Sequence, residues 1–119
     1  MILIGGLGGF ILGFTVDPYF EGGFYAPSLA RFLIKAGHSH GMPMAFFNLI
    51  VGPLVDRLNL SDKGKKYLSY LTLGSFIMPV GLLLRGFTGG AMTFAPVVLI
   101  GALCFLSSAA LIAKGSLAK

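Results

Sequence analysis

The chain has 119 residues, of which 55% are hydrophobic and 11% are charged, and its mean hydropathy is +0.88. This composition lies outside the range of soluble globular domains and predicts an integral membrane protein. The formal net charge of +5 does not indicate a nucleic-acid partner, because the nine basic residues are spread over apolar segments and short loops rather than gathered in a basic stripe.

Four apolar segments follow one another along the chain, separated by short polar or glycine-containing loops. Three of them reach the roughly 20 residues that a helix needs to cross the hydrocarbon core of a bilayer, and the first is somewhat short of that length. We therefore expect a single domain, residues 1–119, that is all-α and integral to the membrane as a four-helix transmembrane bundle. The expected spans are residues 1–16, 28–55, 67–85 and 94–114.

The first segment is apolar from its first residue and lacks the basic region and the small-residue cleavage site of a signal peptide. We expect it to be retained as a span. Gly5, Gly9 and Gly13 recur at every fourth position, a spacing that lets a neighbouring helix approach closely in lipid. The aromatic-rich stretch 18–25 is expected at the membrane interface.

The basic residues near the ends of the segments predict the orientation, because cytoplasmic loops carry an excess of Lys and Arg. They lie between the second and third segments and after the fourth: Arg57, Lys63, Lys65, Lys66, Lys114 and Lys119. We therefore expect both termini to be cytoplasmic, in a prokaryotic cytoplasmic membrane.

The second segment carries ionisable side chains within an otherwise apolar helix. At about 100° per residue, Arg31, Lys35, His38 and Met42 share one face, whereas His40 points the other way. A charged residue at the centre of a span costs roughly 2.5–3.5 kcal/mol, and such residues usually face the bundle interior or mark a functional site. The segment is therefore the candidate functional helix.

Haem b is the cofactor that this pattern favours. His38 lies roughly 4.5 Å from Lys35 and roughly 10 Å from Arg31 along the helix axis, so a haem ligated by His38 would place its propionates near both cations. Arg85, expected on the same side of the membrane, could join this clamp. The chain has two histidines, so a second axial ligand requires another copy, another subunit or a methionine such as Met78. The alternative role of the two cations is to reach the lipid headgroups.

Copper is the second candidate ligand. The stretch HSHGMPM offers nitrogen and thioether donors in His38, His40, Met42 and Met44. A quinone is a third, since a histidine together with Asp17 or Glu21 at the outer interface could handle the protons of a quinol.

Two motifs resemble known families. The pattern from Arg31 to Gly41, R-x6-H-x-H-G, followed by N-L-x-x-G at 48–52, resembles the histidine-bearing helix of small haem-binding membrane proteins and of haem-copper oxidase-like subunits. That resemblance, which covers one helix, implies haem or metal binding at His38 or His40. Residues 86–94, GFTGGAMTF, resemble a segment of the small four-helix fluoride channels, although Met92 stands where those channels have a threonine.

No catalytic triad or phosphate-binding loop is evident, so we do not expect an enzyme that works alone. The leading prediction is a small membrane subunit that binds haem b, or copper, for electron transfer within a homo-oligomer or a larger redox complex. The first alternative is a cofactor-free structural or assembly subunit, in which polar residues such as Ser39 and Asn48 serve helix contacts. The second is a small ion channel. The expected partners are lipids and other transmembrane subunits.

Overall fold

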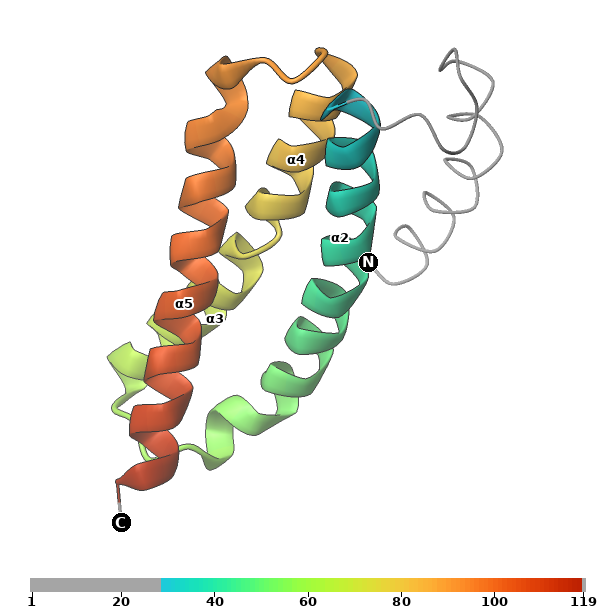
Figure 1. Cartoon of the computed structure of the whole chain (residues 1–119). Coiled ribbons are helices and arrows are strands. Elements are labelled where there is room, and N and C mark those ends of the chain that lie inside the picture. Colours follow the sequence, from blue (N-terminus) through green and yellow to red (C-terminus); the bar gives the residue numbers. More distant parts are fainter. Residues whose placement is uncertain (1–28, 119) are drawn as a thin grey trace.

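The computed structural model of the protein describes residues 29–118, and this part of the chain is helical and contains no strand (Figure 1). Its elements are α2 (Leu29–Leu54), the 3-10 helix η1 (Val55–Arg57), α3 (Asp62–Gly74), α4 (Ile77–Phe87), the 3-10 helix η2 (Met92–Phe94) and α5 (Ala95–Leu117). The span expected at 1–16 lies outside the described residues, so the four-helix bundle stays a prediction.

Two stretches of the described residues are long and apolar enough to cross a membrane. They are Asp62–Phe87, with a mean hydropathy of 1.6, and Met92–Leu117, with 2.3. Helix α2 has 26 residues and agrees in extent with the helix expected at 28–55, but it is not among these two stretches. Its cationic and imidazole side chains lower its hydropathy, so its neighbours in a membrane must accommodate polar groups.

The third helical stretch begins at Asp62 rather than at residue 67 as expected. Ser61 caps it: its backbone is extended and its hydroxyl accepts a hydrogen bond from the Gly64 N–H at 3.3 Å. Asp62 adds a negative charge in the first turn, where the helix dipole favours one. Consequently Lys63 and Lys66 lie in the helix and not in the preceding loop.

The same stretch is broken between α3 and α4, where a continuous helix was expected. Pro79 has no N–H to donate to the carbonyl of Ser75, four residues earlier. The Phe76 N–H bonds to the Leu73 carbonyl, three residues back, at 3.1 Å. The carbonyl of Thr72 is thereby left for side-chain donors. Pro79, together with the Phe76 bond that spans three residues instead of four, explains the break.

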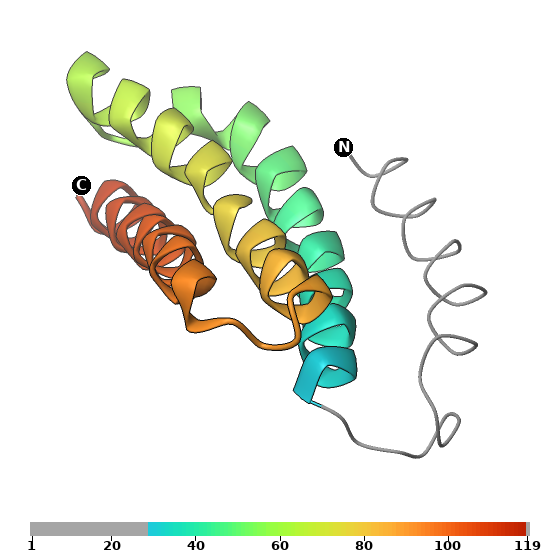
Figure 2. The same ribbon diagram turned by 90° about the horizontal axis from the view of Figure 1, so that it is seen from above.

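Helix α4 lies between α2 and α5, and α3 packs against α5 (Figures 1 and 2). Glycine makes the closest crossings possible. A Cβ at Gly101 of α5 would lie 2.6 Å from the Met78 Cα, and one at Gly86 of α4 would lie 2.9 Å from the Ile34 nitrogen of α2. Backbone therefore meets backbone at both interfaces, as small residues allow in membrane bundles.

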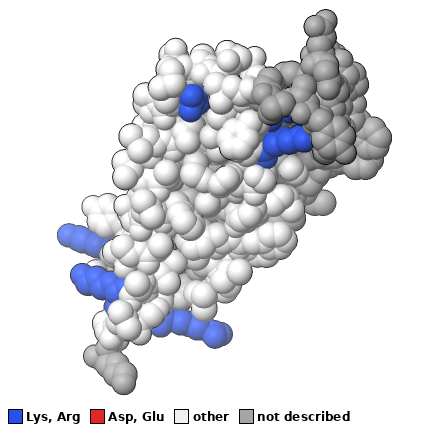
Figure 3. Space-filling view, in the orientation of Figure 1, with Lys and Arg blue, Asp and Glu red and all other residues white. Residues whose placement is uncertain are grey.

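One end of the molecule collects most of the described cations. The Asn59 N–H donates to the Gly115 carbonyl at 3.1 Å and its amide Nδ2 to the Ala118 carbonyl at 3.0 Å, which ties the α2–α3 connection to the end of α5. Lys and Arg side chains gather at this end in the space-filling view (Figure 3). The described Lys and Arg residues of the α2–α3 connection, of the first turns of α3 and of the end of α5 are Arg57, Lys63, Lys65, Lys66 and Lys114. The arrangement brings together the residues on which the predicted orientation rests.

Candidate functional site

The two histidines lie on α2, which runs through Pro43 as one helix. His38 is half-buried and His40 is exposed, as their expected positions on different faces require. An unbroken helix does not let residues two apart face one another. The two imidazoles of one chain therefore cannot bind the same ligand from this helix.

The imidazole of His40 is oriented by its own helix. Its Nδ1 lies 2.7 Å from the carbonyl oxygen of Ala36, and a carbonyl only accepts, so Nδ1 carries the hydrogen. In the neutral ring the lone pair is then on Nε2, and the side chain is exposed at the surface of the described helices. Metal-ligating histidines are commonly oriented by such a bond from the other ring nitrogen.

Ser39 shares the acceptor of His40. Its hydroxyl donates to the Ala36 carbonyl at 3.1 Å, within its own helix. The Ser39 hydroxyl therefore bonds within α2 and does not make the expected contact with another helix. The serine adds a second donor to the carbonyl that positions the imidazole.

Arg31 and Lys35 differ in their surroundings although they lie one turn apart. Arg31 is 3% exposed and Lys35 is exposed, and both side chains have interaction partners. A guanidinium is buried at this depth only when acceptors or negative charge compensate it. The face shared with His38 therefore includes one buried and one accessible cation.

Arg85 serves the loop that follows α4. Its Nε donates to the Ala91 carbonyl at 3.3 Å, and its Nη2 lies 3.5 Å from the Gly90 carbonyl and 3.3 Å from the Met92 sulfur. The guanidinium thus bonds to two carbonyls of the turn and holds its backbone against the end of α4. Joining a propionate clamp, as the sequence suggested, would require these bonds to break.

The methionines expected as copper ligands do not accompany the exposed imidazole. Met44 is 7% exposed and belongs to the apolar core, and Met42 is half-buried. Within residues 29–118, no group of three or more His, Cys, Asp and Glu residues could hold a metal ion. A copper site that paired Met44 with His40 would need Met44 to leave the core.

The segment GFTGGAMTF forms the end of α4, the turn and η2. Gly89 and Gly90 have φ values of +67° and +94°, in the region that side chains disfavour. Thr93 is exposed. Turn geometry therefore accounts for the paired glycines that resemble the fluoride channels.

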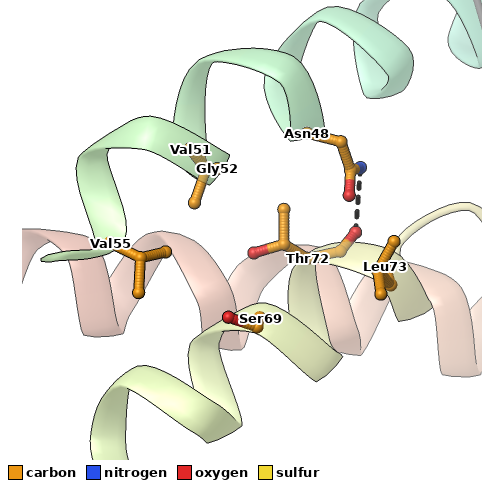
Figure 4. A pocket seen from close by; sticks show the side chains of 7 residues that line it. All are labelled: Asn48, Val51, Gly52, Val55, Ser69, Thr72 and Leu73. Atoms are coloured by element: carbon orange, nitrogen blue, oxygen red, sulfur yellow. Dashed lines mark hydrogen bonds between the residues drawn. The ribbon is translucent and has the colours of Figure 1, made fainter.

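A second polar cluster joins α2 to the break between α3 and α4. The carbonyl of Thr72 accepts from the Asn48 Nδ2 at 3.0 Å (Figure 4). It also accepts from the Ser75 hydroxyl at 2.6 Å. The expected role of Asn48 as a contact between helices is confirmed. The cluster itself was not predicted, because Pro79 removes the helical donor of the Ser75 carbonyl, which accepts from the Met78 N–H at 3.2 Å, and not that of the Thr72 carbonyl.

A cavity of about 220 Å³ lies beside this cluster, between the C-terminal part of α2 and α3 (Figure 4). Its lining consists of Asn48, Val51, Gly52, Val55, Ser69, Thr72 and Leu73. The described part of the chain thus has two polar features of interest, the histidine helix and this cavity. Comparison of the chain with known protein families, with curated proteins and with solved structures gives no match.

Proposed function

We propose that the protein is a small integral membrane subunit that binds haem b through α2 and carries electrons within an oligomer or a larger redox complex. The observation that carries the proposal is the orientation of His40, whose Nδ1–H is held by Ala36 while Nε2 remains a donor of its lone pair at an exposed surface. Neutral imidazole in this state is a haem ligand.

Helix α2 also has exposed apolar side chains at a distance from His40. Leu29, Phe32 and Ile50, which lie 11, 8 and 10 residues from His40 along the helix, are 57%, 66% and 58% exposed. A second copy of the chain, related by a two-fold axis, would supply the second His40 and complete a bis-histidine haem. One haem would then bind to two chains.

His38 is the other candidate axial ligand, since it shares its face with Arg31 and Lys35. The two cations favour His38 as the ligand, because cations close to haem propionates form charge-assisted hydrogen bonds with them. Haem binding can therefore use either His40 or His38 as the axial ligand, and substitution of one histidine at a time distinguishes the two possibilities.

The test is the absorption spectrum of the protein purified in mild detergent, oxidised and then reduced with dithionite, with haem quantified per chain. We expect a Soret band and a sharp reduced α band, both lost in the variant of the ligating histidine, His40→Ala or His38→Ala. Ser39→Ala is the matched control, because it removes a donor to the same carbonyl without removing a ligand. Added imidazole should restore the band in the affected histidine variant.

A protein that is colourless as purified, and that neither shifts nor sharpens the Soret band of added hemin, would refute haem binding. The function then favoured is the cofactor-free structural subunit, which the polar contact between Asn48 and Thr72 supports. Such a subunit should co-purify with transmembrane partners in a fixed stoichiometry.

Integration in the membrane, with the basic end on the cytoplasmic side, is part of the same proposal. It is supported by the two apolar stretches and by the cations gathered at one end. In a Cys104→Ser background, Ser61→Cys should resist a membrane-impermeant maleimide applied to intact cells, whereas Thr88→Cys should react. The opposite labelling pattern would reverse the assigned orientation.

A further inference from the structure

The cavity beside the broken helix has a mainly apolar lining with a few polar groups, whose donors and acceptors can be counted. Three of its seven residues carry polar side-chain atoms: Asn48, Ser69 and Thr72. The others are aliphatic or glycine. No lining residue carries a carboxylate, a thiol or a basic group.

Every donor hydrogen of these three side chains is already used. The amide Nδ2 of Asn48 donates to the Met44 carbonyl at 2.9 Å and to the Thr72 carbonyl at 3.0 Å. The hydroxyl of Ser69 donates to the Lys65 carbonyl at 3.1 Å. The Thr72 hydroxyl donates to the backbone carbonyl of the residue four positions earlier at 2.6 Å.

Only acceptor capacity therefore remains for an occupant. An amide oxygen keeps two lone pairs, and a hydroxyl that has donated its hydrogen still accepts. The Oδ1 of Asn48 and the hydroxyl oxygens of Ser69 and Thr72 are thus three uncharged acceptors. An occupant that is itself an acceptor, such as a carboxylate or a quinone carbonyl, finds no donor among these side chains.

We propose that this cavity is a binding site for a small monovalent cation, Na⁺, K⁺ or ammonium, coordinated by these three oxygens and by water. Divalent cations prefer carboxylate ligands, and soft transition metals prefer thiolate or imidazole, neither of which lines the cavity. The volume of about 220 Å³ is several times the roughly 30 Å³ of one water, so the ion keeps part of its hydration shell.

The neighbourhood of the break supports a cation. Interrupted helices in membrane proteins commonly supply oxygen ligands for monovalent ions near the middle of the bilayer. Thr72 is 3% exposed, whereas Ser69 is exposed and lies at the mouth. Lys65, one turn before Ser69 on α3, directs its Nζ to the Asp56 carbonyl at 3.0 Å, and neither Lys65 nor Asp56 lines the cavity.

The experiment measures thermal unfolding of the purified protein in detergent by far-UV circular dichroism. NaCl, KCl and NH4Cl are titrated separately against N-methyl-D-glucamine chloride, at constant ionic strength. We expect a saturable rise of the melting temperature with at least one small cation, since a ligand that binds only the folded state stabilises it. N-methyl-D-glucamine is a bulky organic cation that oxygen ligands cannot surround as they surround a small ion, and it should have no effect.

Substitutions of Ser69 test whether the cation-dependent stabilisation arises in the cavity. Ser69 is exposed, so its substitution leaves the apolar core intact. Ser69→Ala, which removes one oxygen, should weaken apparent cation affinity about tenfold, and Ser69→Asp, which adds a charged oxygen, should strengthen it by at least that factor. Ser116→Ala, an exposed serine of α5 outside the cavity, is the matched control. Equal melting temperatures in all four salts would show that no cation binds, and equal affinities in wild type and both Ser69 variants would show that the cation binds outside the cavity; either result overturns the proposal.

Discussion

The crossing of α4 and α5 gives the sharpest test of the packing. Replacement of Gly101 by alanine places a Cβ 2.6 Å from the Met78 Cα, whereas ordinary carbon contacts begin near 3.4 Å. The Met78 backbone nitrogen would lie closer still, so the two backbones must separate by more than about 0.8 Å, because backbone cannot rotate away as a long side chain can. We expect Gly101→Ala to destabilise the protein by about 1–3 kcal/mol, the usual range for overpacking.

Gly41→Ala is the matched control on α2. Its Cβ would lie 3.8 Å from the Pro79 Cβ, an ordinary van der Waals contact. Alanine is the better helix former by about 0.5–1 kcal/mol, so this variant should be as stable as the wild type or more stable. The measurement is unfolding in mixed SDS and mild-detergent micelles, followed by circular dichroism. If Gly101→Ala proved as stable as Gly41→Ala, the close crossing of α4 and α5 would be wrong.

Three further changes test local features. Arg85→Lys removes the planar guanidinium that contacts the turn after α4, and we expect a loss of about 1 kcal/mol with faster amide hydrogen exchange in that turn. Unchanged exchange would contradict the role given to Arg85. Asn48→Ala leaves the Thr72 carbonyl with Ser75 alone, and it should cost about 1 kcal/mol in the same unfolding assay; a neutral result would mean that water replaces the amide. Ser61→Ala removes the cap of α3 and should cost about 1 kcal/mol, whereas Ser116→Ala should lie within about 0.5 kcal/mol of wild type; equal values would contradict the cap.

The positions of the long helices followed from the sequence because apolar length is a local property. The expected helices at 28–55 and 94–114 correspond closely to Leu29–Leu54 and Ala95–Leu117. The opposite directions of His38 and His40 also followed, since helical periodicity depends on spacing alone. What could be predicted was therefore what depends on neighbours in the chain.

The break between α3 and α4 was missed because its cause is divided between two helices. Pro79 removes one helical N–H locally, but the Thr72 carbonyl exposed by the break is bonded by Asn48, which is 24 residues from Thr72 in the chain. The role of Arg85 was missed for a related reason: its acceptors are carbonyls of a turn whose shape depends on two glycines with positive φ. Backbone acceptors leave no signature in residue identity.

The two halves of the broken helix share one partner, and this limits how the molecule can move. Gly74, before the break, faces Cys104 of α5, with 2.9 Å between a Cβ there and the cysteine sulfur, while Met78, after the break, faces Gly101. Bending at the break would pull one half away from α5, so we expect α3, α4 and α5 to move as one rigid body. Flexibility is then assigned to α2, where Pro43 leaves the Ser39 carbonyl without its usual helical donor. Motion of the C-terminal half of α2 about Pro43 would widen or narrow the cavity beside Asn48. Access to that cavity would then be controlled by the movement of this half of α2 alone.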